Sequence, residues 1–171
     1  LEQTLARMMD EGAVLDAVVA QSETQRRALW SMREAAADIH RHWLPQVESD
    51  VCLPLDRVAD FIDLTLPRIH AYDPGATELT VAHLGDGNIH HVVLPTRDDP
   101  ALADSIRETV EDVVQELGGS FSAEHGIGKE KLATMRRRKD PVAIEVMRAI
   151  KAALDPRGIL NPGKVIPDRQ D

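Results

Sequence analysis

The sequence predicts an α+β fold, in which an antiparallel sheet is covered by helices. Two observations carry this prediction: several stretches place apolar residues at helical spacing, and residues 79–94 contain a hairpin signal. At the centre of the hairpin lies Asp86-Gly87, a dipeptide that suits a two-residue turn because both of its residues tolerate positive φ. Helices combined with an antiparallel strand pair are typical of the α+β class.

The N-terminal part is predicted to contain two helices with a strand between them. Residues 1–11 have the apolar spacing of a helix, whereas residues 14–20 are mostly apolar and β-branched and predict a buried strand. Ser22 is the predicted N-cap of the second helix, with Gln25 at the capping-box position, and this helix is predicted to continue to about Ile39.

The middle of the chain alternates between strands and helices. Residues 49–54 predict a short strand, and Pro54 begins a helix that Pro67 either kinks or ends. After the hairpin, Asp98-Asp99-Pro100 opens a long helix that Gly118-Gly119 closes.

The C-terminal part is predicted to be mainly helical. Residues 120–124 are expected to be extended and residues 129–138 to form a short basic helix. Asp140 caps the next helix, which runs to Leu154 and is followed by a tail rich in proline and glycine at residues 155–167.

Composition limits the size and the partners of the protein. The 171 residues suffice for one domain, which we expect to span residues 1–171. A net charge of −9 without a basic stripe argues against nucleic acid and anionic membranes as partners. Because the chain begins inside a predicted helix, we interpret it as a piece of a longer protein.

The cellular location is predicted from cysteine use and hydropathy. The single cysteine, Cys52, lies between two apolar residues, which predicts a buried, unreactive thiol in a reducing compartment. We expect neither a signal peptide nor a membrane span. The predicted location is cytoplasmic, with peripheral attachment to the inner membrane as the alternative.

Two histidines flank the predicted turn. If the chain reverses between Asp86 and Gly87, His83 faces His90 across the strand pair, with Cβ atoms about 5 Å apart. Two imidazoles at that distance can share one metal ion. The alternative is a pair of turn-flanking histidines that bond to the backbone. His91 falls on the opposite face and is predicted to be structural or at the surface.

A second polar cluster follows the long helix, at residues 120–129. Glu124 could complete a metal site with two histidines and one carboxylate, leaving a coordination position open for substrate. His125 points away in an extended chain, but it reaches the same cavity if Gly126 and Gly128 bend the backbone. The alternative is a solvated Glu124 and a helix-capping His125.

Four motifs occur in a recognisable order: Leu29-Trp30-Ser31-Met32-Arg33-Glu34, His83-Leu84-Gly85-Asp86-Gly87-Asn88-Ile89-His90, Gly119 with Glu124-His125-Gly126-Ile127-Gly128, and Leu154-Asp155-Pro156-Arg157-Gly158-Ile159-Leu160-Asn161-Pro162-Gly163-Lys164. Together they resemble the C-terminal domain of FAD-linked oxidases of the vanillyl-alcohol-oxidase type. The most similar branch is that of the D-2-hydroxyglutarate, D-lactate and glycolate dehydrogenases. The resemblance implies a ferredoxin-like core with a C-terminal helical segment.

The resemblance also implies a mechanism. A separate N-terminal domain would bind FAD, and this chain would be the substrate domain in which a 2-hydroxy acid loses its C2 hydride to the flavin. A divalent metal, zinc in the first instance, at His83, His90 and Glu124 would polarise the substrate hydroxyl. His125 would accept the hydroxyl proton as general base.

Three further residues acquire roles from the resemblance. Arg33 would clamp a substrate carboxylate, although the residues alone favour an exposed arginine paired with Glu34. Asn161 and Lys164 would contact the cofactor, although their surroundings also specify a rigid turn. The implied partners are the 2-hydroxy acid, the FAD domain of the same protein, a downstream electron acceptor and, in a homodimer, a second copy.

Two positions depart from the hydroxyglutarate branch. Glu48 and Val92 stand where that branch would have a lysine and an asparagine, so a lactate-like substrate stays open. Two other classes of function remain: a flavin-independent metal-binding domain or metallohydrolase that uses the same ligands, and a non-catalytic interaction module with acidic helices.

Overall fold

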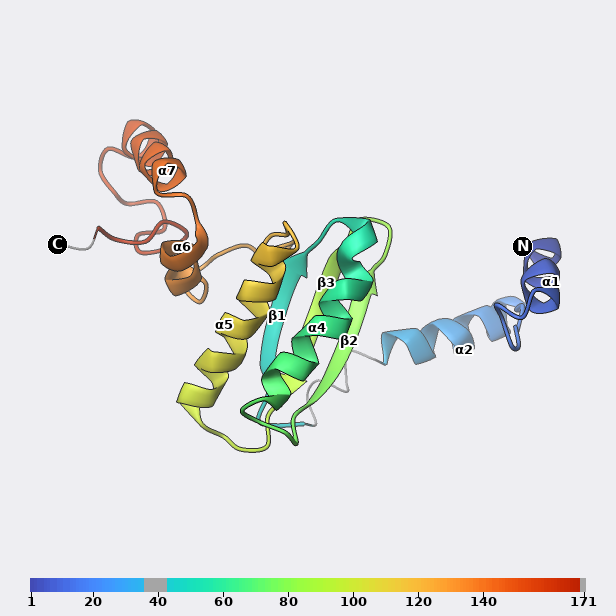
Figure 1. The fold of residues 1–171 in the computed structure, drawn as a ribbon. Coiled ribbons are helices and arrows are strands. Elements are labelled where there is room, and N and C mark those ends of the chain that lie inside the picture. Colours follow the sequence, from blue (N-terminus) through green and yellow to red (C-terminus); the bar gives the residue numbers. More distant parts are fainter. Residues whose placement is uncertain (36–42, 170–171) are drawn as a thin grey trace. The chain divides into compact units, whose positions relative to one another are not determined.

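A computed structural model describes residues 1–35 and 43–169 of the chain (Figure 1). The chain divides into two compact units, Leu1–Trp43 and Leu44–Asp171, and each is described by itself.

The first unit contains helix α1 (Glu2–Asp10) and helix α2 (Glu23–Glu34). The N-cap prediction is confirmed, because Ser22 Oγ accepts a hydrogen bond of 3.2 Å from the Gln25 N–H. The predicted extension of this helix to Ile39 falls on residues outside the described ranges.

The predicted buried strand at residues 14–20 is wrong. None of these residues is in a strand, and the side chains of Leu15 and Val18 are 95% and 76% exposed. The backbone N–H groups of Ala13 and Val14 instead bond to the Met8 carbonyl and prolong the end of α1. A strand requires a partner for its backbone groups, and among the described residues of this unit there is no other strand.

The second unit contains a β-α-β-β-α core. In chain order its elements are β1 (Val47–Cys52), the 3-10 turn η1 (Leu55–Arg57), α4 (Val58–His70), β2 (Thr77–His83), β3 (Asn88–Leu94) and α5 (Pro100–Glu116). The antiparallel sheet has the order β1-β3-β2, and a single bridge from Ser120 to Cys52 adds a remnant of a fourth strand beside β1. This arrangement is that of the ferredoxin-like fold and confirms the predicted α+β class.

Helices α4 and α5 cover one face of the sheet (Figure 1). Alternate residues of the strands point toward them and form two apolar clusters together with residues of the two helices. The members of the first cluster are Val51, Leu53, Val58, Phe61, Ile89, Val110, Val113, Val114 and Leu117, and those of the second are Val47, Ile69, Ala76, Val93, Leu102 and Ile106. Because the helices occupy this face, the opposite face of the sheet is left for other contacts.

The helix boundaries largely follow the predicted capping residues. Asp99 caps α5 as predicted, through a bond from the Ala101 N–H. Pro67 does not end α4, which continues to His70, since a proline in the last turn costs only one backbone hydrogen bond. Cys52 is half-buried rather than buried, with its Sγ 3.6 Å from the Asp86 carbonyl oxygen.

The hairpin exists, but its predicted register is wrong by two residues. His83 pairs with Asn88, and His90 pairs with Val81, so the loop contains four residues rather than two. The Gly87 carbonyl accepts a bond from the Leu53 N–H, which holds the loop against the end of β1 and sets its length. A shift of two residues preserves the face of every side chain, so His83 and His90 still share one face.

The C-terminal part contains α6 (Leu132–Arg138) and α7 (Pro141–Leu154). Asp140 caps α7 as predicted, by accepting the N–H groups of Val142 and Ala143. Residues 120–124 are extended only in part, because Ser120 pairs with Cys52 whereas the backbone bends at residue 121 and again at residues 123–125. In the described part of the chain, no helix has the length and apolar character needed to cross a membrane.

Candidate functional site

The uncovered face of the sheet carries a group of polar side chains. Asp50 of β1 pairs with His90 of β3, and His83 and Asn88 are cross-strand partners at the loop end of the hairpin. Partners across antiparallel strands point to the same side, so these four side chains share one face. Asp50 and Asn88 are nevertheless almost fully buried, with 4% and 5% of their surfaces exposed.

A turn at residues 123–125 is tied to this face by Asp50. Its Oδ2 atom accepts hydrogen bonds from three consecutive backbone N–H groups, those of Ala123, Glu124 and His125, at 3.1, 3.0 and 2.9 Å. The glycine-rich stretch that follows lets the chain bend here, since Gly126 and Gly128 adopt positive φ of 73° and 53°. The bend brings both Glu124 and His125 to the strand that carries His90.

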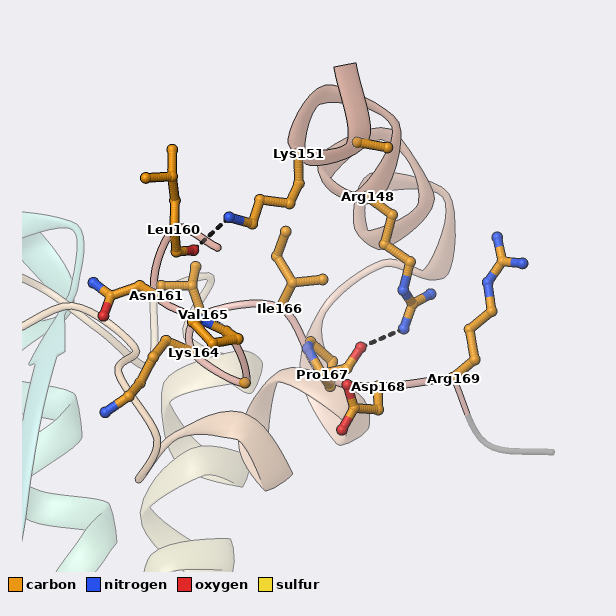
Figure 2. A pocket seen from close by; sticks show the side chains of 13 residues that line it. Arg148, Lys151, Leu160, Asn161, Lys164, Val165, Ile166, Pro167, Asp168 and Arg169 are labelled. Carbon is orange, nitrogen blue, oxygen red and sulfur yellow. Dashed lines mark hydrogen bonds between the residues drawn. The ribbon is translucent and has the colours of Figure 1, made fainter. Parts of the chain in front are cut away.

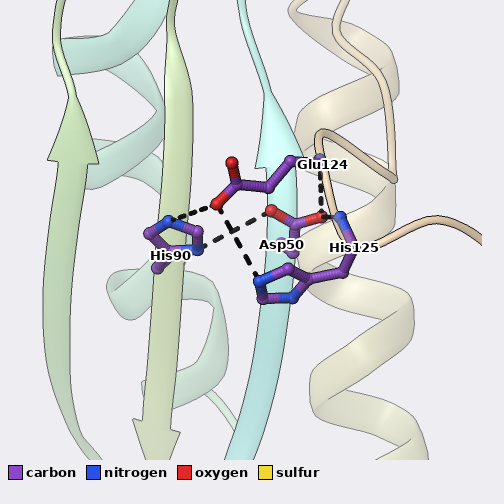
Figure 3. Close-up of side chains that lie close together, drawn as sticks. All are labelled: Asp50, His90, Glu124 and His125. Atoms are coloured by element: carbon purple, nitrogen blue, oxygen red, sulfur yellow. Dashed lines mark hydrogen bonds and ion pairs between the residues drawn. The ribbon is translucent and has the colours of Figure 1, made fainter. Parts of the chain in front are cut away.

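The result is a cluster of Asp50, His90, Glu124 and His125, which we call the sheet-face cluster (Figure 3). One potential ligand atom from each of these residues lies within 4.8 Å of the others. His90 Nε2 is 3.2 Å from Glu124 Oε1, while its Nδ1 atom is 3.6 Å from Asp50 Oδ1. The His125 ring stacks on the His90 ring at 5.3 Å, with its Nε2 3.9 Å from Glu124 Oε1.

His83 lies beside the sheet-face cluster without belonging to it. Its ring meets the His90 ring edge-on, with centroids 5.1 Å apart and planes at 78°. The two histidines are therefore diagonal neighbours, as the shifted register requires, rather than the direct cross-strand pair that the sequence predicted.

The charges of the cluster suit a cation. Burial by itself would raise the pKa of the Asp50 carboxyl, but the His125 N–H bond and the nearby Lys131 charge together lower that pKa below its usual value. Asp50 is therefore ionised, and Glu124 adds a second carboxylate within reach of two imidazoles. Among the described residues, Asp50 Oδ1 has no hydrogen-bond partner although it is buried. Carboxylate oxygens and imidazole nitrogens of this kind are ligands for a divalent metal such as zinc.

His91 has the structural role predicted for it. Its side chain is fully buried on the helix side of the sheet, where it meets the Phe61 ring edge-on at 5.2 Å and its Nδ1 atom bonds to Thr80 Oγ1. Burial lowers the pKa of His91 to about 4, so the ring is neutral near pH 7.

The other predicted site residues lie in different parts of the chain. Arg33 is an exposed residue of α2, in the first compact unit. Asn161 and Lys164 line a cavity of about 560 Å³ in the segment after α7 (Figure 2). Figure 2 shows two other cations of this cavity bonded to backbone carbonyls, Lys151 to that of Leu160 and Arg148 to that of Pro167.

Sequence reasoning missed Asp50 and Lys131 as residues of this site. Lys131 donates to the Asp50 carbonyl and to Ser122 Oγ, and its Nζ is 3.6 Å from Asp50 Oδ2. The sequence offers little signal for Asp50, because Glu48, Ser49 and Asp50 are consecutive polar residues of β1 and only the sheet shows that Asp50 is the buried one. Its partners could not be named from the sequence, because they come from a turn more than seventy residues away.

Comparison with known proteins agrees with these features. The protein-family model described as "FAD linked oxidases, C-terminal domain" matches residues 1–165. The chain therefore belongs to the family of C-terminal domains of FAD-linked oxidases.

Curated relatives carry a more specific name. The chain is 34% identical to the D-2-hydroxyglutarate dehydrogenase of Stutzerimonas stutzeri, over 96% of this chain and 37% of that protein. It is 36% identical to the mitochondrial D-2-hydroxyglutarate dehydrogenase of Danio rerio, over 98% of this chain and 31% of that protein. It is 34% identical to the mitochondrial D-2-hydroxyglutarate dehydrogenase of Bos taurus, over 95% of this chain and 30% of that protein. The chain thus spans about a third of the length of the curated relatives it matches.

Proposed function

We propose that this chain is the substrate-binding domain of an FAD-dependent D-2-hydroxy acid dehydrogenase, whose flavin is bound mainly by a separate N-terminal domain. The family match and the names of the relatives support this class of reaction. The observation that carries the proposal is the placement of Glu124 and His125 against His90 on the uncovered face of the sheet.

His90 and Glu124, together with His83, would hold a divalent cation such as zinc. A cation bound there would act as a Lewis acid that polarises the 2-hydroxyl group and a carboxylate oxygen of the substrate. The residues fit such a cation, because His90 Nε2 and Glu124 Oε1 face each other at 3.2 Å and the His83 ring contacts that of His90. Asp50 adds negative charge behind His90.

His125 is the proposed general base that accepts the hydroxyl proton, while FAD accepts the C2 hydride. Both nitrogens of His90 already face carboxylates, those of Asp50 and Glu124. His125 is more open, with 62% of its side chain exposed, so its ring is accessible to a substrate. Histidine is also the side chain that most readily exchanges a proton near neutral pH.

The first candidate for the substrate is D-2-hydroxyglutarate, the acid in the names of the relatives. A specific observation favours a second candidate, a monocarboxylic acid such as D-lactate. Glu48 and Val92 are direct cross-strand partners beside the Asp50–His90 pair. A second substrate carboxylate near them would meet a negative charge and an apolar side chain instead of cationic and polar groups.

Other residues and partners belong to this proposal through family membership. Arg33 would bind a substrate carboxylate, and Asn161 and Lys164 would contact FAD or the domain that holds it. A downstream acceptor would reoxidise the flavin, and a homodimer is proposed for the assembly. The predicted location is cytoplasmic, and the mitochondrial names of several relatives make that organelle the alternative.

The test is a substrate screen on the intact protein with a dye as electron acceptor, with and without a chelator. We expect a yellow protein that oxidises D-2-hydroxyglutarate or D-lactate and loses this activity when the chelator removes the metal. A colourless intact protein without FAD would contradict the proposal. Flavin-independent hydrolysis that depends on His90 and Glu124 would favour a metallohydrolase instead.

A further inference from the structure

We propose that Asp50 is the positioning residue of the sheet-face cluster, with a separate task for each carboxylate oxygen. Oδ2 holds the turn that presents Glu124 and His125, and Oδ1 orients the His90 ring so that its Nε2 atom is free to bind a cation. The inference rests on the function proposed above and adds a residue that sequence reasoning did not assign to the site.

The first task follows from the hydrogen bonds of Oδ2. Three consecutive backbone N–H groups converge on this one oxygen within 3.1 Å, which is the arrangement of an anion-binding nest. Hydrogen bonds to an ionised acceptor are stronger than those between neutral groups. Residues 123–125 form neither a helix nor a strand, so these bonds are a main restraint on the turn.

The second task follows from the two nitrogens of His90. Nδ1 faces Asp50 Oδ1 at 3.6 Å, and Nε2 faces Glu124 Oε1 at 3.2 Å on the other side of the ring. A histidine that binds a metal usually directs its other ring nitrogen to a carboxylate, which fixes the tautomer and the ring orientation. The buried Oδ1 atom accepts no hydrogen bond within the described ranges, so it has a lone pair to offer the Nδ1–H group.

The ammonium group of Lys131 stabilises the buried negative charge of Asp50. This group lies 3.6 Å from Oδ2 and donates to the Asp50 carbonyl and to Ser122 Oγ. It therefore connects β1 to the segment that carries Glu124, and it compensates a carboxylate that is only 4% exposed. Lys131 and three N–H groups surround Oδ2, and Oδ1 faces the Nδ1 atom of His90, so Asp50 is proposed as an outer partner of the cluster rather than as a metal ligand.

Two substitutions separate the two tasks. In Asp50→Asn the amide oxygen can still accept the backbone N–H groups, but the NH₂ group then faces His90. This forces His90 Nδ1 to be an acceptor and moves the ring proton to Nε2, the atom needed by the cation. Asp50→Ala removes both contacts. Asp73→Asn is the matched control, since Asp73 is 2% exposed and also binds a backbone N–H group, that of Thr96, outside the cluster.

The intact protein is used for three measurements: Zn²⁺ affinity by titration, hydrogen exchange of the peptide around residues 123–125, and the ¹⁵N signals of the His90 ring. For Asp50→Asn we expect near-native exchange, a His90 proton on Nε2, and a Zn²⁺ affinity and kcat lower by about 10- to 100-fold. For Asp50→Ala we expect the same losses together with faster exchange of the turn. Asp73→Asn should change none of these quantities.

Three results would overturn the inference: native Zn²⁺ affinity in Asp50→Asn, an unchanged His90 tautomer, or native exchange of the turn in Asp50→Ala. A purely structural role predicts the first two, because Asn preserves the shape of Asp. If the wild-type protein oxidises no 2-hydroxy acid, the proposed function fails on its own. The tautomer and exchange measurements then still decide whether Asp50 positions His90 and the turn.

Discussion

Gly87 occupies a position that no other residue can take without displacing the backbone. A Cβ atom there would lie 2.0 Å from the Leu53 carbonyl oxygen, and the φ of Gly87 is +76°. Leu53 follows the strand that carries Asp50, and Gly87 precedes the strand that carries His90. The contact of this glycine with Leu53 therefore helps to set how the two strands of the site meet.

We predict that Gly87→Ala destabilises the protein by about 2–4 kcal/mol, the combined cost of overpacking and of a left-handed conformation in a residue with a Cβ atom. Gly85→Ala is the control, because no atom lies within 4 Å of its added Cβ. It should change the stability by less than about 0.5 kcal/mol. Urea unfolding of both variants measures the difference, and equal stabilities would contradict the assigned contact.

At the scale of residues, side-chain chemistry could be predicted and long-range pairing could not. His90, Glu124 and His125 could be singled out because their types bind metals and transfer protons, and the structure brings the three together. The role of Asp50 could not be predicted, because it depends on the pairing of β1 with β3 and on a turn that is distant in the sequence. The role predicted for Arg33 stays a prediction, since Arg33 belongs to the other compact unit.

Glu111 connects two elements, α5 and α6. This glutamate is 8% exposed, accepts a hydrogen bond of 2.6 Å from Thr134 Oγ1, and pairs with Arg137 and Arg138 at 3.0 and 3.2 Å. Helix α6 follows the segment with Glu124, His125 and Lys131, so its attachment to α5 restrains that segment at its C-terminal end.

We predict that Glu111→Ala lowers the stability by about 1.5–3 kcal/mol, because the Thr134 hydroxyl loses its buried acceptor and Arg137 and Arg138 lose the carboxylate they share. It should also speed proteolytic cleavage between α5 and α6. Glu108→Ala is the control, since Glu108 is half-exposed and its carboxylate lies as far as 3.7 Å from the Arg137 guanidinium. This substitution should lower the stability by less than about 1 kcal/mol. Urea unfolding and limited proteolysis compare the two variants. A similar small effect of both would show that Glu111 does not anchor α6.

At the scale of elements, local signals predicted most helices and failed where pairing decided the outcome. The caps at Ser22, Asp99 and Asp140 are side-chain bonds to nearby N–H groups, and all three could be predicted from their own neighbourhoods. The hairpin register could not, because the loop is held by Leu53 from another part of the chain. The strand predicted at residues 14–20 failed for the opposite reason, since the described part of its unit offers no strand to pair with.

At the scale of the whole molecule, the two faces of the sheet in the second unit differ in chemistry. Helices α4 and α5 bury apolar side chains on one face, and the other face carries histidines and carboxylates. The polar face is therefore the one on which the proposed cation and substrate would bind. The chain belongs to the family of C-terminal domains of FAD-linked oxidases, and it spans about a third of the length of the curated relatives it matches.

The metal content of the intact protein, measured after purification without chelators, tests the cation-assisted site most directly. His90→Ala removes a proposed ligand, whereas His70→Gln is a control in which the new amide can still donate to the Ala76 carbonyl that His70 contacts. We predict a stoichiometric divalent ion in the wild type and in His70→Gln, and its loss together with 2-hydroxy acid oxidation in His90→Ala. A His90→Ala protein that keeps the ion, or an active wild type that contains none, would contradict the account.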